Sequence, residues 1–491
     1  MEDRVAAVFK GTTVFISGGT GFIGKVLIEK LLRCCQVKQI FVLIRRKKGM
    51  SINERINHMF KNPLYDTLRE RDPEAFKKCT GMSGDVCEPN LGMSQYFRNL
   101  VINEADFIFH SAATTRFDDT VKYAVTMNTR GTKFMLDLAK ECKKLKLFVH
   151  LSTAYAFPQE KVLGERRYEP PANPHSVIES LEWIKDDASD KLTKEILQNT
   201  PNTYTFSKAL AEELVNEQVG KLPVLILRPS LVVPIFDSPL KGWVNNLQGP
   251  MGLFVGAGKG VIRSMYMNPN AYANLIPVDA VVNIILLMTR EKLTKKLDGH
   301  IYNAVVPKED NNRTWQEIID TGRKIVEEEV PFNIVLWYPG GSIQTNKYVH
   351  LFNFYMFQLI PAIFVDILLY ILGYDPILYT SQRRIQKAAS MFEFYTGRSW
   401  DFDNSAEMVR DGMNEIETKL YRIDSKNFDV HDYLVNCMMT VKRVNLHEPL
   451  EYLPKAQRNL KILYYVDRFC KGMFFVMVFY YIFKLVVHLM S

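Results

Sequence analysis

A tyrosine and a lysine four residues apart are the side chains with the most evident capacity for proton transfer in this chain. Tyr204 and Lys208 belong to the run Tyr-Thr-Phe-Ser-Lys, a spacing that places both side chains on one face of a helix. A lysine ammonium beside a phenol favours the phenolate and lowers the pKa of the phenol. Such a tyrosine can give a proton to a carbonyl oxygen while a hydride reaches the carbonyl carbon. The spacing alone is weak evidence, because Tyr480 and Lys484 repeat it inside an apolar tail.

The position of the first pair in the chain strengthens its interpretation. An apolar strand is expected at residues 147–151, and Ser152 and Thr153 follow it directly, upstream of the helix that Tyr204 opens. A hydroxyl at the end of such a strand can hydrogen-bond the same carbonyl oxygen. We favour Thr153 over Ser152 for this role and keep both as candidates. The predicted catalytic residues are therefore Tyr204, Lys208, Thr153 and Ser152.

A glycine-rich turn near the N-terminus predicts a nucleotide-binding βαβ unit. The run Ser-Gly-Gly-Thr-Gly-Phe-Ile-Gly occupies residues 17–24, between an apolar run and a helical pattern. We expect Gly18 to take a positive φ, Gly21 to let the backbone approach a pyrophosphate, and Gly24 to let helix and strand pack closely. The N-terminus of the helix then offers free N–H groups to the phosphates. An ordinary tight turn is the alternative.

Basic residues after the second expected strand indicate which nucleotide is bound. Arg45 and Arg46 follow the apolar run at residues 39–44, where an NAD-dependent enzyme usually carries an acidic residue for the ribose 2′-hydroxyl. A guanidinium pairs with a 2′-phosphate that a carboxylate would repel, so the sequence favours NADPH. A solvated basic loop is the alternative. Asp85, which follows Gly84, is placed either to contact adenine at the end of a third strand or to serve as a turn aspartate.

Strand-like and helical patterns alternate through the first 230 residues. This alternation predicts an α/β fold with a Rossmann-type doubly wound parallel sheet. A polar stretch at about 160–200 lies between two elements that must come together, so we expect a loop excursion near the site. A polar run at residues 309–312 marks an expected boundary. The expected strands lie at residues 13–16, 39–44, 107–110, 147–151 and 224–227, and the expected helices at 122–140 and 207–219.

The chain becomes more apolar and aromatic beyond about residue 340. Residues 352–372 are interrupted by Pro361 and Asp366, so we expect a buried hairpin or an interfacial helix rather than a membrane span, and we favour the interfacial helix. Residues 473–490 are almost entirely apolar and follow a basic flank. This pattern predicts a C-terminal membrane helix with its flank in the cytoplasm. Lys484 within that run keeps a buried or interfacial helix as the alternative.

The composition narrows the classes of function. The 491 residues exceed one compact core, so two domains with appendages are expected. A net charge of +8 suits an anionic substrate or an anionic membrane surface, and the absence of a recognition motif predicts no nucleic-acid partner. Seven cysteines without a Cys-x-x-Cys pair argue for a reducing compartment and against a disulfide scaffold or a zinc site, so no metal is expected.

Several further motifs accompany the glycine-rich turn and the tyrosine–lysine pair. They are Gly84-Asp-Val86, His110-Ser-Ala-Ala-Thr-Thr-Arg-Phe-Asp118, Leu151-Ser-Thr-Ala-Tyr155, Arg228-Pro-Ser230, Gly242-Trp-Val-Asn-Asn-Leu-Gln-Gly249, Gly256-Ala-Gly-Lys-Gly260, Ile276-Pro-Val-Asp279 and Phe394-Tyr-Thr-Gly-Arg-Ser-Trp-Asp-Phe402. The combination resembles the extended short-chain dehydrogenase/reductase superfamily and, within it, the alcohol-forming fatty acyl-CoA reductases. The resemblance covers essentially the whole chain. Ser17 and Ser207 stand where threonine is more usual, and both keep a hydroxyl.

The resemblance implies that NADPH reduces a long-chain fatty acyl-CoA to a primary fatty alcohol plus CoA. Two hydride transfers through an aldehyde are implied, with the substrate oxygen stabilised by Tyr204 and Thr153. Asn128 is expected to fix backbone geometry or a water near Lys208, or else to be a helix-start asparagine. The residues expected to contact the cofactor are Gly18, Thr20, Gly21, Phe22, Ile23, Gly24, Arg45, Arg46, Asp85, Val86, Ser111, Ala112, Ala113, Asn128, Tyr204, Lys208, Pro229 and Ser230.

The resemblance also implies three parts and a location. They are an NADP-binding extended Rossmann domain at residues 10–310, a helical C-terminal module at 345–446 and a hydrophobic membrane helix at 473–490. The implied location is the membrane of the endoplasmic reticulum or the peroxisome, with the catalytic domain facing the cytoplasm. A nucleotide-sugar epimerase or dehydratase of the same fold is one alternative, which the apolar C-terminal part disfavours. A non-catalytic NADP-binding membrane scaffold is another, which the intact catalytic residues disfavour.

Overall fold

The chain folds into two compact units that are interleaved in sequence. The computed structural model describes residues 2–294, 297–306, 313–423 and 428–490, so the expected boundary at residues 309–312 lies outside the described residues. The first unit comprises Met1–Asn245, Tyr272–Asn312 and Ser399–Phe428, and the second comprises Asn246–Ala271, Arg313–Arg398 and Asp429–Ser491. Residues 399–428, which belong to the predicted helical module, therefore pack with the first unit. The three predicted domain ranges stay predictions.

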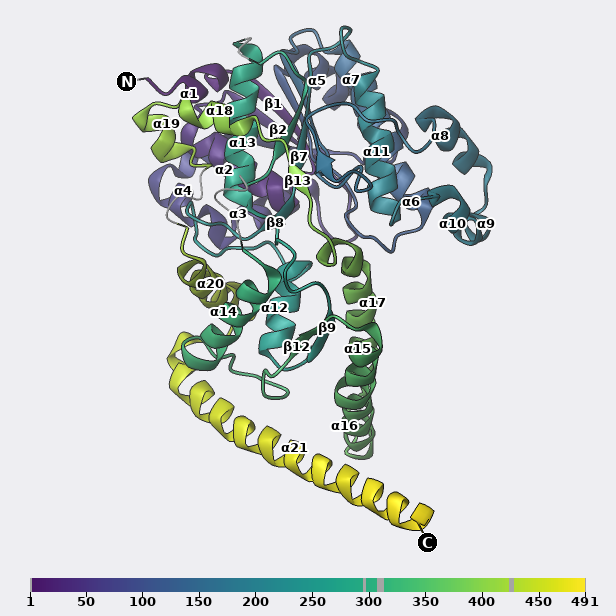
Figure 1. The fold of residues 1–491 in the computed structure, drawn as a ribbon. Helices are drawn as coiled ribbons and strands as arrows, with labels where there is room; N and C mark the ends of the chain where they lie inside the picture. The colour runs from purple at the N-terminus through teal and green to yellow at the C-terminus, as the bar shows by residue number, and fades with distance from the viewer. Residues whose placement is uncertain (1, 295–296, 307–312, 424–427, 491) are drawn as a thin grey trace. The chain divides into compact units, whose positions relative to one another are not determined.

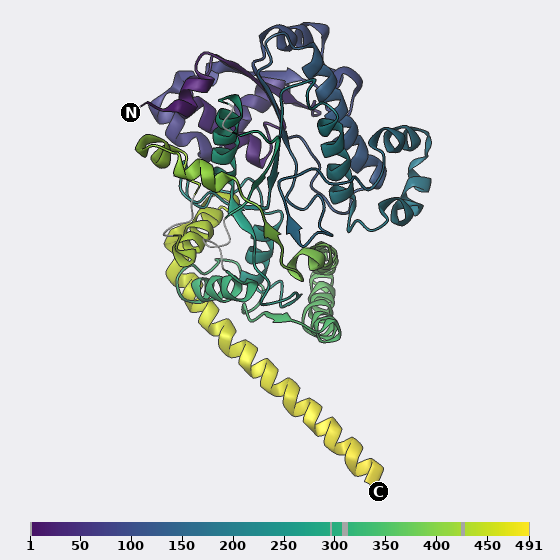
Figure 2. The same ribbon diagram turned by 45° about the horizontal axis from the view of Figure 1, so that its top comes forward.

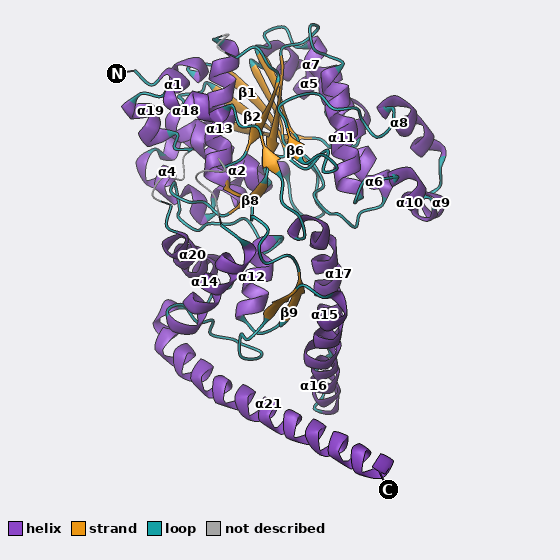
Figure 3. Cartoon of the chain, in the orientation of Figure 1, coloured by secondary structure: helices purple, strands orange, loops and turns teal. Residues whose placement is uncertain are grey.

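A seven-stranded sheet forms the centre of the first unit, and each neighbouring pair of strands is parallel. The strand order β11-β7-β5-β4-β1-β2-β3 confirms the predicted doubly wound α/β fold. Figures 1 and 3 show the sheet between its helices. Five strands arise from the expected apolar runs. β3 lies where a strand before Asp85 was one of two interpretations, and β11 was not among the expected strands. The strands are β1 (Thr13–Ser17), β2 (Gln39–Ile44), β3 (Cys79–Ser83), β4 (Phe107–His110), β5 (Leu147–Leu151), β7 (Val224–Pro229) and β11 (Ile301–Ala304).

Helices cover both faces of this sheet, and Figure 2 shows the same layering from a second direction. One layer contains α1 (Arg4–Phe9), α2 (Phe22–Cys34) and α13 (Val278–Leu293), and the other contains α5 (Gln95–Glu104), α7 (Gly131–Glu141) and α11 (Thr203–Asn216). The core between the sheet and the second layer buries Phe15, Ile108 and Phe148, which lie in register on neighbouring strands. Phe206 and Leu210 of α11 pack into the same core. This packing fixes α11 above the strands that end near the site.

Two helices of the first unit differ from the predicted ranges. The expected helix at 122–140 is built from α6 (Val121–Ala124), the π-helical turn η4 (Val125–Arg130) and α7. The second expected helix begins earlier than predicted, at Thr203, because the Asn202 side chain caps it by accepting a hydrogen bond from the Thr205 N–H at 2.9 Å. Tyr204 therefore lies in the first turn of α11.

The polar stretch at 160–200 contains regular structure and is not only the expected loop excursion. It holds β6 (Val162–Leu163), α8 (Pro174–Trp183), α9 (Asp186–Lys191) and α10 (Thr193–Leu197). The other elements of the first unit are α3 (Ile52–Phe60), η1 (Pro63–Tyr65), α4 (Asp66–Arg71), η2 (Pro73–Lys78), η3 (Pro89–Gly92), β8 (Leu231–Val233), β10 (Leu275–Pro277), β13 (Asp401–Phe402), α18 (Ala406–Asp411) and α19 (Glu415–Leu420).

The second unit is mostly helical and ends in a long hydrophobic helix, as the sequence predicted. A small parallel pair of strands, β9 (Ser264–Tyr266) and β12 (Ser342–Gln344), accompanies the helices. The helices are α12 (Pro250–Gly258), α14 (Trp315–Glu328), α15 (Lys347–Phe354), η5 (Tyr355–Leu359), α16 (Ile360–Ile371), α17 (Leu378–Thr396), α20 (Val430–Thr440), η6 (Val441–Asn445), η7 (Leu450–Tyr452) and α21 (Leu453–Met490). Figure 1 shows α21 as the yellow C-terminal helix.

Asp467 fixes the first half of α21 to its own unit. Its buried carboxylate accepts hydrogen bonds from Arg263 at 2.9 Å and Trp337 at 2.6 Å, and it pairs with Lys471 at 2.7 Å. Beyond this point the helix exposes nearly all of its large apolar side chains. Among the described residues, Lys347–Ile371 and Leu450–Met490 are helical stretches long and apolar enough to cross a membrane.

Candidate active site

The glycine-rich turn between β1 and α2 has room for glycine alone at two of its predicted positions. Gly18 has a φ of +73°, and a Cβ there would lie 2.6 Å from the backbone nitrogen of Ala112. A Cβ at Gly24 would lie 2.3 Å from the carbonyl oxygen of Gly18. The positive φ predicted for Gly18 and the close helix–strand packing predicted for Gly24 are therefore confirmed.

Gly21 differs from these two glycines because the space beside it is open. A Cβ there would meet only the Gly18 carbonyl oxygen within 4 Å, at 3.1 Å. Gly21 is also the N-cap of α2, and among the residues that the structure describes no side-chain hydrogen bond caps the start of that helix. An open approach to uncapped N–H groups is the arrangement that a phosphate group requires. Thr20, Phe22 and Ile23 are half-buried around this turn.

Arg45 and Arg46, which follow β2, are exposed. Their side chains are therefore accessible to a phosphate group. Arg46 donates from Nε to the Ser83 hydroxyl, at the end of the neighbouring strand β3, at 2.9 Å. Arg55 donates to the carbonyl oxygen of Arg45. Asp85 accepts a hydrogen bond from the Cys87 N–H at 3.0 Å, which is the behaviour of a turn aspartate. Its predicted contact with adenine stays a prediction.

The segment after β4 runs beside the glycine-rich turn. The hydroxyl of Ser111 donates to the Ser17 carbonyl oxygen at 2.8 Å, and its N–H donates to the same oxygen at 3.2 Å. Ala112 and Ala113 continue this segment and are half-buried. Ser111 is therefore held against the end of β1, and it begins the run of predicted cofactor contacts at residues 111–113. Val86, another predicted contact, is buried and packs beside Gly131.

The strand-end hydroxyls on β5 and β7 are buried. Thr153 accepts a hydrogen bond from the Tyr155 N–H at 3.3 Å. Within the described part of the chain, the hydroxyls of Ser152 and Ser230 have no hydrogen-bond partner. A buried polar group without a partner calls for one from a ligand or water. The free hydroxyl of Ser152 makes it at least as good a candidate as Thr153 for hydrogen-bonding the substrate oxygen. Ser230 directly follows Pro229, the last residue of β7.

Lys208 lies one turn beyond Tyr204 on α11 and is almost completely buried. Its Nζ atom donates to the carbonyl oxygen of Leu151, the last residue of β5, at 2.7 Å. Burial lowers the lysine pKa to about 8, and the Glu212 carboxylate opposes part of that shift. The structure thus joins the helix that carries Tyr204 and Lys208 to the strand that leads into Ser152.

Asn128 fixes the backbone beside this helix, which is one of the roles predicted for it. It belongs to the π-helical turn η4, so it is not a helix-start asparagine. Its side-chain oxygen accepts from the Thr114 N–H at 2.9 Å, and its side-chain nitrogen donates to the Thr114 carbonyl oxygen at 3.0 Å and the Ser207 hydroxyl at 2.9 Å. Such π-helical turns occur frequently at functional sites. Asn128 thereby connects the segment after β4 to α11.

Sequence reasoning gave His110 no role, yet the structure places it at the centre of a buried hydrogen-bonded chain. Its Nδ1 atom lies 2.7 Å from the Ser17 hydroxyl, and its Nε2 atom lies 3.0 Å from the Thr132 hydroxyl. Thr132 donates to the Asn128 carbonyl oxygen at 2.6 Å, so it accepts from Nε2, and Ser17 donates to Nδ1. Burial and the nearby Lys208 lower the His110 pKa to about 3, so the ring is neutral.

A second buried histidine lies beside this chain. His150 pairs in register with His110 on the neighbouring strand, with ring centroids 5.4 Å apart. Neither of its ring nitrogens has a hydrogen-bond partner among the residues that the structure describes. Burial, Lys208 and His110 together lower its pKa well below the ordinary value, so it is neutral. Both histidines occur inside apolar strand patterns, and no motif in the sequence signals their contacts.

A buried ion pair joins α11 to β7 one turn beyond Lys208. Arg228 of β7 makes two hydrogen bonds to the Glu212 carboxylate, at 2.9 and 2.6 Å. The arginine also donates to the Gly164 carbonyl oxygen at 3.0 Å, and its guanidinium lies over the rings of Phe157 and Tyr168. The pair therefore holds α11, β7 and the segment after β5 together.

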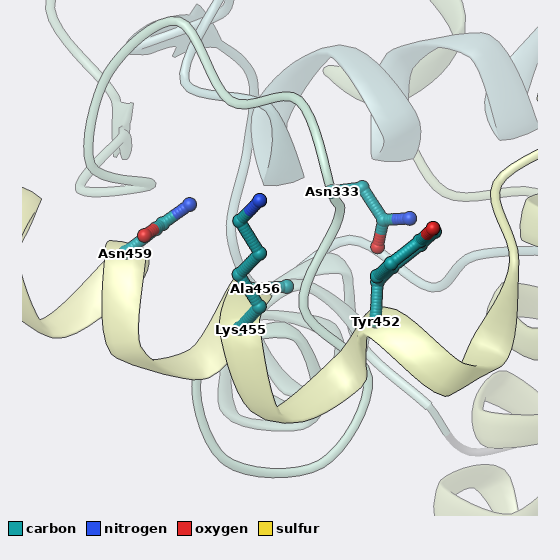
Figure 4. A pocket seen from close by; sticks show the side chains of 5 residues that line it. All are labelled: Asn333, Tyr452, Lys455, Ala456 and Asn459. Carbon is teal, nitrogen blue, oxygen red and sulfur yellow. The ribbon is translucent and has the colours of Figure 1, made fainter.

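One pocket of the second unit is formed by η7, the start of α21 and the loop that carries Asn333 (Figure 4). The Asn333 side chain donates to the Pro449 carbonyl oxygen at 3.3 Å. None of the predicted catalytic or cofactor-binding residues lines this pocket. Its lining residues are Asn333, Tyr452, Lys455, Ala456 and Asn459.

Two family models, both described as male sterility protein, match this chain, at residues 16–285 and at residues 357–448. Full-length relatives agree with them. Fatty acyl-CoA reductase 1 of Rattus norvegicus is 33% identical over 458 residues, covering 93% of this chain and 88% of that protein. The Xenopus laevis protein of the same name is 34% identical over 462 residues, with the same shares covered. Fatty acyl-CoA reductase wat of Drosophila melanogaster is 31% identical over 469 residues, covering 94% and 90%.

Solved structures support the fold. The reductase domain of a nonribosomal peptide synthetase from Mycobacterium tuberculosis matches with a TM-score of 0.59 and 19% identity, covering 91% of this chain and 97% of that one. The terminal reductase domain of the myxalamid biosynthetic pathway matches with a TM-score of 0.54 and 19% identity, covering 88% and 91%. The first family model and the relatives, which extend over most of the sequence, show that the chain belongs to the fatty acyl-CoA reductase family of oxidoreductases.

Proposed function

We propose that this protein reduces long-chain fatty acyl-CoA with NADPH to a primary fatty alcohol and CoA. The single observation that carries the proposal is the hydrogen bond between Lys208 and Leu151, which brings the tyrosine–lysine helix to the strand end with Ser152 and Thr153. A proton donor, a cationic neighbour and strand-end hydroxyls are the groups that a carbonyl reduction needs. The relatives named fatty acyl-CoA reductases support the same substrate class.

The residues around the glycine-rich turn fit a dinucleotide. The uncapped start of α2 suits a pyrophosphate, and the open space beside Gly21 admits it. Arg45 and Arg46 would hold the 2′-phosphate that distinguishes NADPH from NADH. When bound, NADPH would supply one hydride to the thioester carbonyl carbon and a second NADPH would supply one to the aldehyde.

The chain's own residues would donate the proton and the hydrogen bonds that the substrate oxygen needs. Tyr204 would donate a proton to the carbonyl oxygen as that oxygen becomes negative, and Lys208 would stabilise the phenolate left behind. Ser152 or Thr153 would donate a hydrogen bond to the same oxygen. In the first reduction the hemithioacetal would return its hydroxyl proton to the Tyr204 phenolate as CoA thiolate leaves, which gives the aldehyde and restores the proton donor. In the second, protonation by Tyr204 would give the alcohol.

The apolar C-terminal helix supports a membrane location for this activity. A long acyl chain partitions into lipid, so an enzyme at the membrane surface meets its substrate and releases its product there. The basic residues before the apolar run favour a cytoplasmic flank. We propose the endoplasmic reticulum or the peroxisome as the membrane, with the catalytic part facing the cytoplasm.

Single-turnover measurements of NADPH absorbance test the substrate class. Full-length protein in detergent is mixed with NADPH and either palmitoyl-CoA or a UDP-sugar. Loss of absorbance with palmitoyl-CoA and not with the UDP-sugar is expected. Epimerisation or dehydration of the UDP-sugar returns the hydride to the sugar and leaves the absorbance unchanged; its detection by chromatography, with NAD⁺ also supplied, would support the epimerase or dehydratase alternative. Tight NADPH binding without turnover of either compound would support a non-catalytic scaffold.

A further inference from the structure

Helix α16 exposes a complete apolar stripe. Ile360, Ile363, Phe364, Ile367, Leu368 and Ile371 are 37% to 71% exposed. Their spacing of three and four residues places them on one face of the helix. Soluble monomers rarely leave a continuous apolar surface of this kind uncovered.

The opposite face of α16 is used inside its own unit. Ala362 and Asp366 are buried on that side. The Asp366 carboxylate accepts hydrogen bonds from the N–H groups of Ile377 at 3.1 Å, Leu378 at 2.9 Å and Tyr379 at 2.7 Å. It therefore satisfies the first backbone donors of α17, which follows α16 in a helical hairpin. The acidic residue that interrupts the apolar sequence is explained by this capping contact.

The end of α16 is also satisfied by its own backbone. The N–H groups of Leu372, Gly373 and Tyr374 donate to the carbonyl oxygens of Leu368, Tyr370 and Leu369, at 3.0, 3.0 and 2.8 Å. Gly373 has a φ of +82°, the conformation that a glycine allows where a helix ends. Backbone groups paired in this way tolerate an environment that is poor in water.

The helical stretch Lys347–Ile371 is long enough to span a bilayer, but its first half is fixed to the second unit. His350 of α15 lies 2.9 Å from the Ser264 hydroxyl of β9, and both groups are buried. The side-chain oxygen of Gln358 accepts a hydrogen bond from the Arg263 N–H at 2.9 Å. Tyr348, Val349 and Phe352 of this half are exposed as well, and the continuous apolar stripe is carried by the 12 residues of α16. At 1.5 Å per residue it is about 18 Å long, which is too short to cross a hydrocarbon core of about 30 Å.

A contact joins this region to the apolar tail. The rings of Phe357 in η5 and Phe474 in α21 have centroids 5.6 Å apart. Phe357 precedes the α16 stripe, and Phe474 stands at the start of the exposed apolar half of α21. The start of the α16 stripe therefore lies close to the start of the exposed apolar half of α21. A membrane that binds this half of α21 can also contact the stripe.

The distribution of charge favours a lipid surface over a protein partner. Between residues 348 and 382, Asp366 and Asp375 are the only acidic residues, and lysine and arginine do not occur. Arg383 and Arg384 then follow on α17, and both are exposed. An apolar face with basic residues close by is the pattern of a helix that lies in an anionic membrane interface.

We propose that α16 lies in the plane of an anionic phospholipid bilayer, with its stripe in the interface, as a second membrane contact besides α21. This inference depends on the proposed membrane location and is independent of the substrate. A helix of this kind buries its apolar face roughly 5–10 Å into the boundary between headgroups and acyl chains. The second unit would then be held at two points, so that it could not swing freely about α21.

Depth-dependent quenching in the full-length protein tests this placement. Ile367→Cys is labelled with the fluorophore NBD, on a background in which the exposed Cys470 is replaced by serine. Phe479→Cys in the apolar half of α21 and Tyr96→Cys in α5 of the first unit are matched exposed positions. Each protein is placed in nanodiscs of phosphatidylcholine and phosphatidylserine that contain a quencher at a shallow or a deep position of the acyl chain.

The label at residue 367 should be quenched at least twofold more by the shallow quencher than by the deep one. The label at residue 479 should respond most to the deep quencher, and the label at residue 96 to neither. A label at 367 that behaves like the one at 96 would overturn the proposal. Stronger quenching of the label at 367 by the deep quencher would indicate a membrane span and would also overturn the proposal. Blue-shifted emission without quenching would indicate that protein covers the stripe, and it would overturn the proposal as well. Reductase activity measured on the same samples reports separately on the proposed function.

Discussion

The Nζ atom of Lys208 hydrogen-bonds the carbonyl oxygen of Leu151 at 2.7 Å, across 57 residues of sequence. This contact ties α11 to the end of β5, where Ser152 and Thr153 follow. It is made by a lysine that is almost wholly buried. The proton chemistry of the proposed site therefore depends on a cation held at a low-dielectric strand end.

Replacing Tyr204 with phenylalanine tests the proton donor. The variant should retain NADPH binding, because the nucleotide turn is unchanged, and should lose fatty alcohol formation by roughly 10²-fold or more, the usual scale of a general acid. Tyr155→Phe is the matched control, because Tyr155 is a second tyrosine close to the strand-end hydroxyls. This variant should retain most of the wild-type rate. Near-normal turnover in Tyr204→Phe together with loss in Tyr155→Phe would move the role to Tyr155.

The pH dependence of kcat/KM for NADPH should reflect Lys208. Its pKa in the folded protein is about 8, below its ordinary value of 10.5. The ammonium is needed to favour the phenolate, so activity should be retained below about pH 8 and fall as the pH rises through that value. Lys208→Arg should be slower but should keep its activity to higher pH, because a guanidinium stays protonated. An alkaline limb at the same pH in both proteins would show that another group titrates.

The same shift has a consequence for stability. Because the folded-state pKa lies below the unfolded one, the unfolded chain binds more protons between about pH 8 and 10.5. The free energy of unfolding therefore gains a positive contribution from Lys208 as the pH rises through this window. Thermal unfolding of wild type and Lys208→Met should show that this contribution is absent from the variant. Parallel pH profiles for the two proteins would contradict the assignment.

Arg45 and Arg46 should determine the choice between NADPH and NADH. Replacing them with aspartate and alanine removes a charged hydrogen-bonded pair worth about 1.5–3 kcal/mol. The ratio of kcat/KM for NADPH to that for NADH should fall by about 10- to 100-fold. Lys47→Ala with Lys48→Ala, in the same exposed loop, controls for the general positive potential and should change the ratio little. An unchanged ratio in the arginine variant would show that other residues read the phosphate.

Deleting residues 473–491 tests the C-terminal anchor. The seven-stranded sheet lies wholly upstream of the deletion, and Asp467 with its partners remains, so both units should stay folded. The variant should appear in the soluble fraction after carbonate extraction, because an interfacial α16 alone is a peripheral contact. An unrelated transmembrane helix in place of the deleted residues should restore pelleting. A full-length protein that is soluble without detergent would contradict the anchor.

Much of the fold was predictable because the strands of a parallel sheet are buried on both faces. The runs that became β1, β2, β4, β5 and β7 are nearly continuous in apolar residues. β3 contains Gly81, and β11 carries Asn303, so neither has that signature. The Asn303 side chain donates to the carbonyl oxygens of Leu163 and Asp403, at 2.8 Å each, so its place in a strand is decided by tertiary contacts.

The candidate site was predictable only where its residues fall within one local pattern. Tyr204 and Lys208 are four residues apart, and helical geometry alone places them together. The Ser17 and His110 contact joins residues 93 positions apart, and no local pattern reports it. Ser152 and Thr153 were predictable as a pair, whereas the difference in their hydrogen bonding depends on packing around β5.

The most direct test of the proposed function is the stoichiometry of products from palmitoyl-CoA. Purified full-length protein is supplied with NADPH deuterated at the transferred position, and products are measured by mass spectrometry alongside free CoA. The proposal predicts hexadecanol with two deuterium atoms on its first carbon, one CoA released per alcohol, and two NADPH oxidised. Aldehyde as the only product, CoA release with fatty acid and no deuterium, or no NADPH oxidation with any acyl-CoA would contradict it.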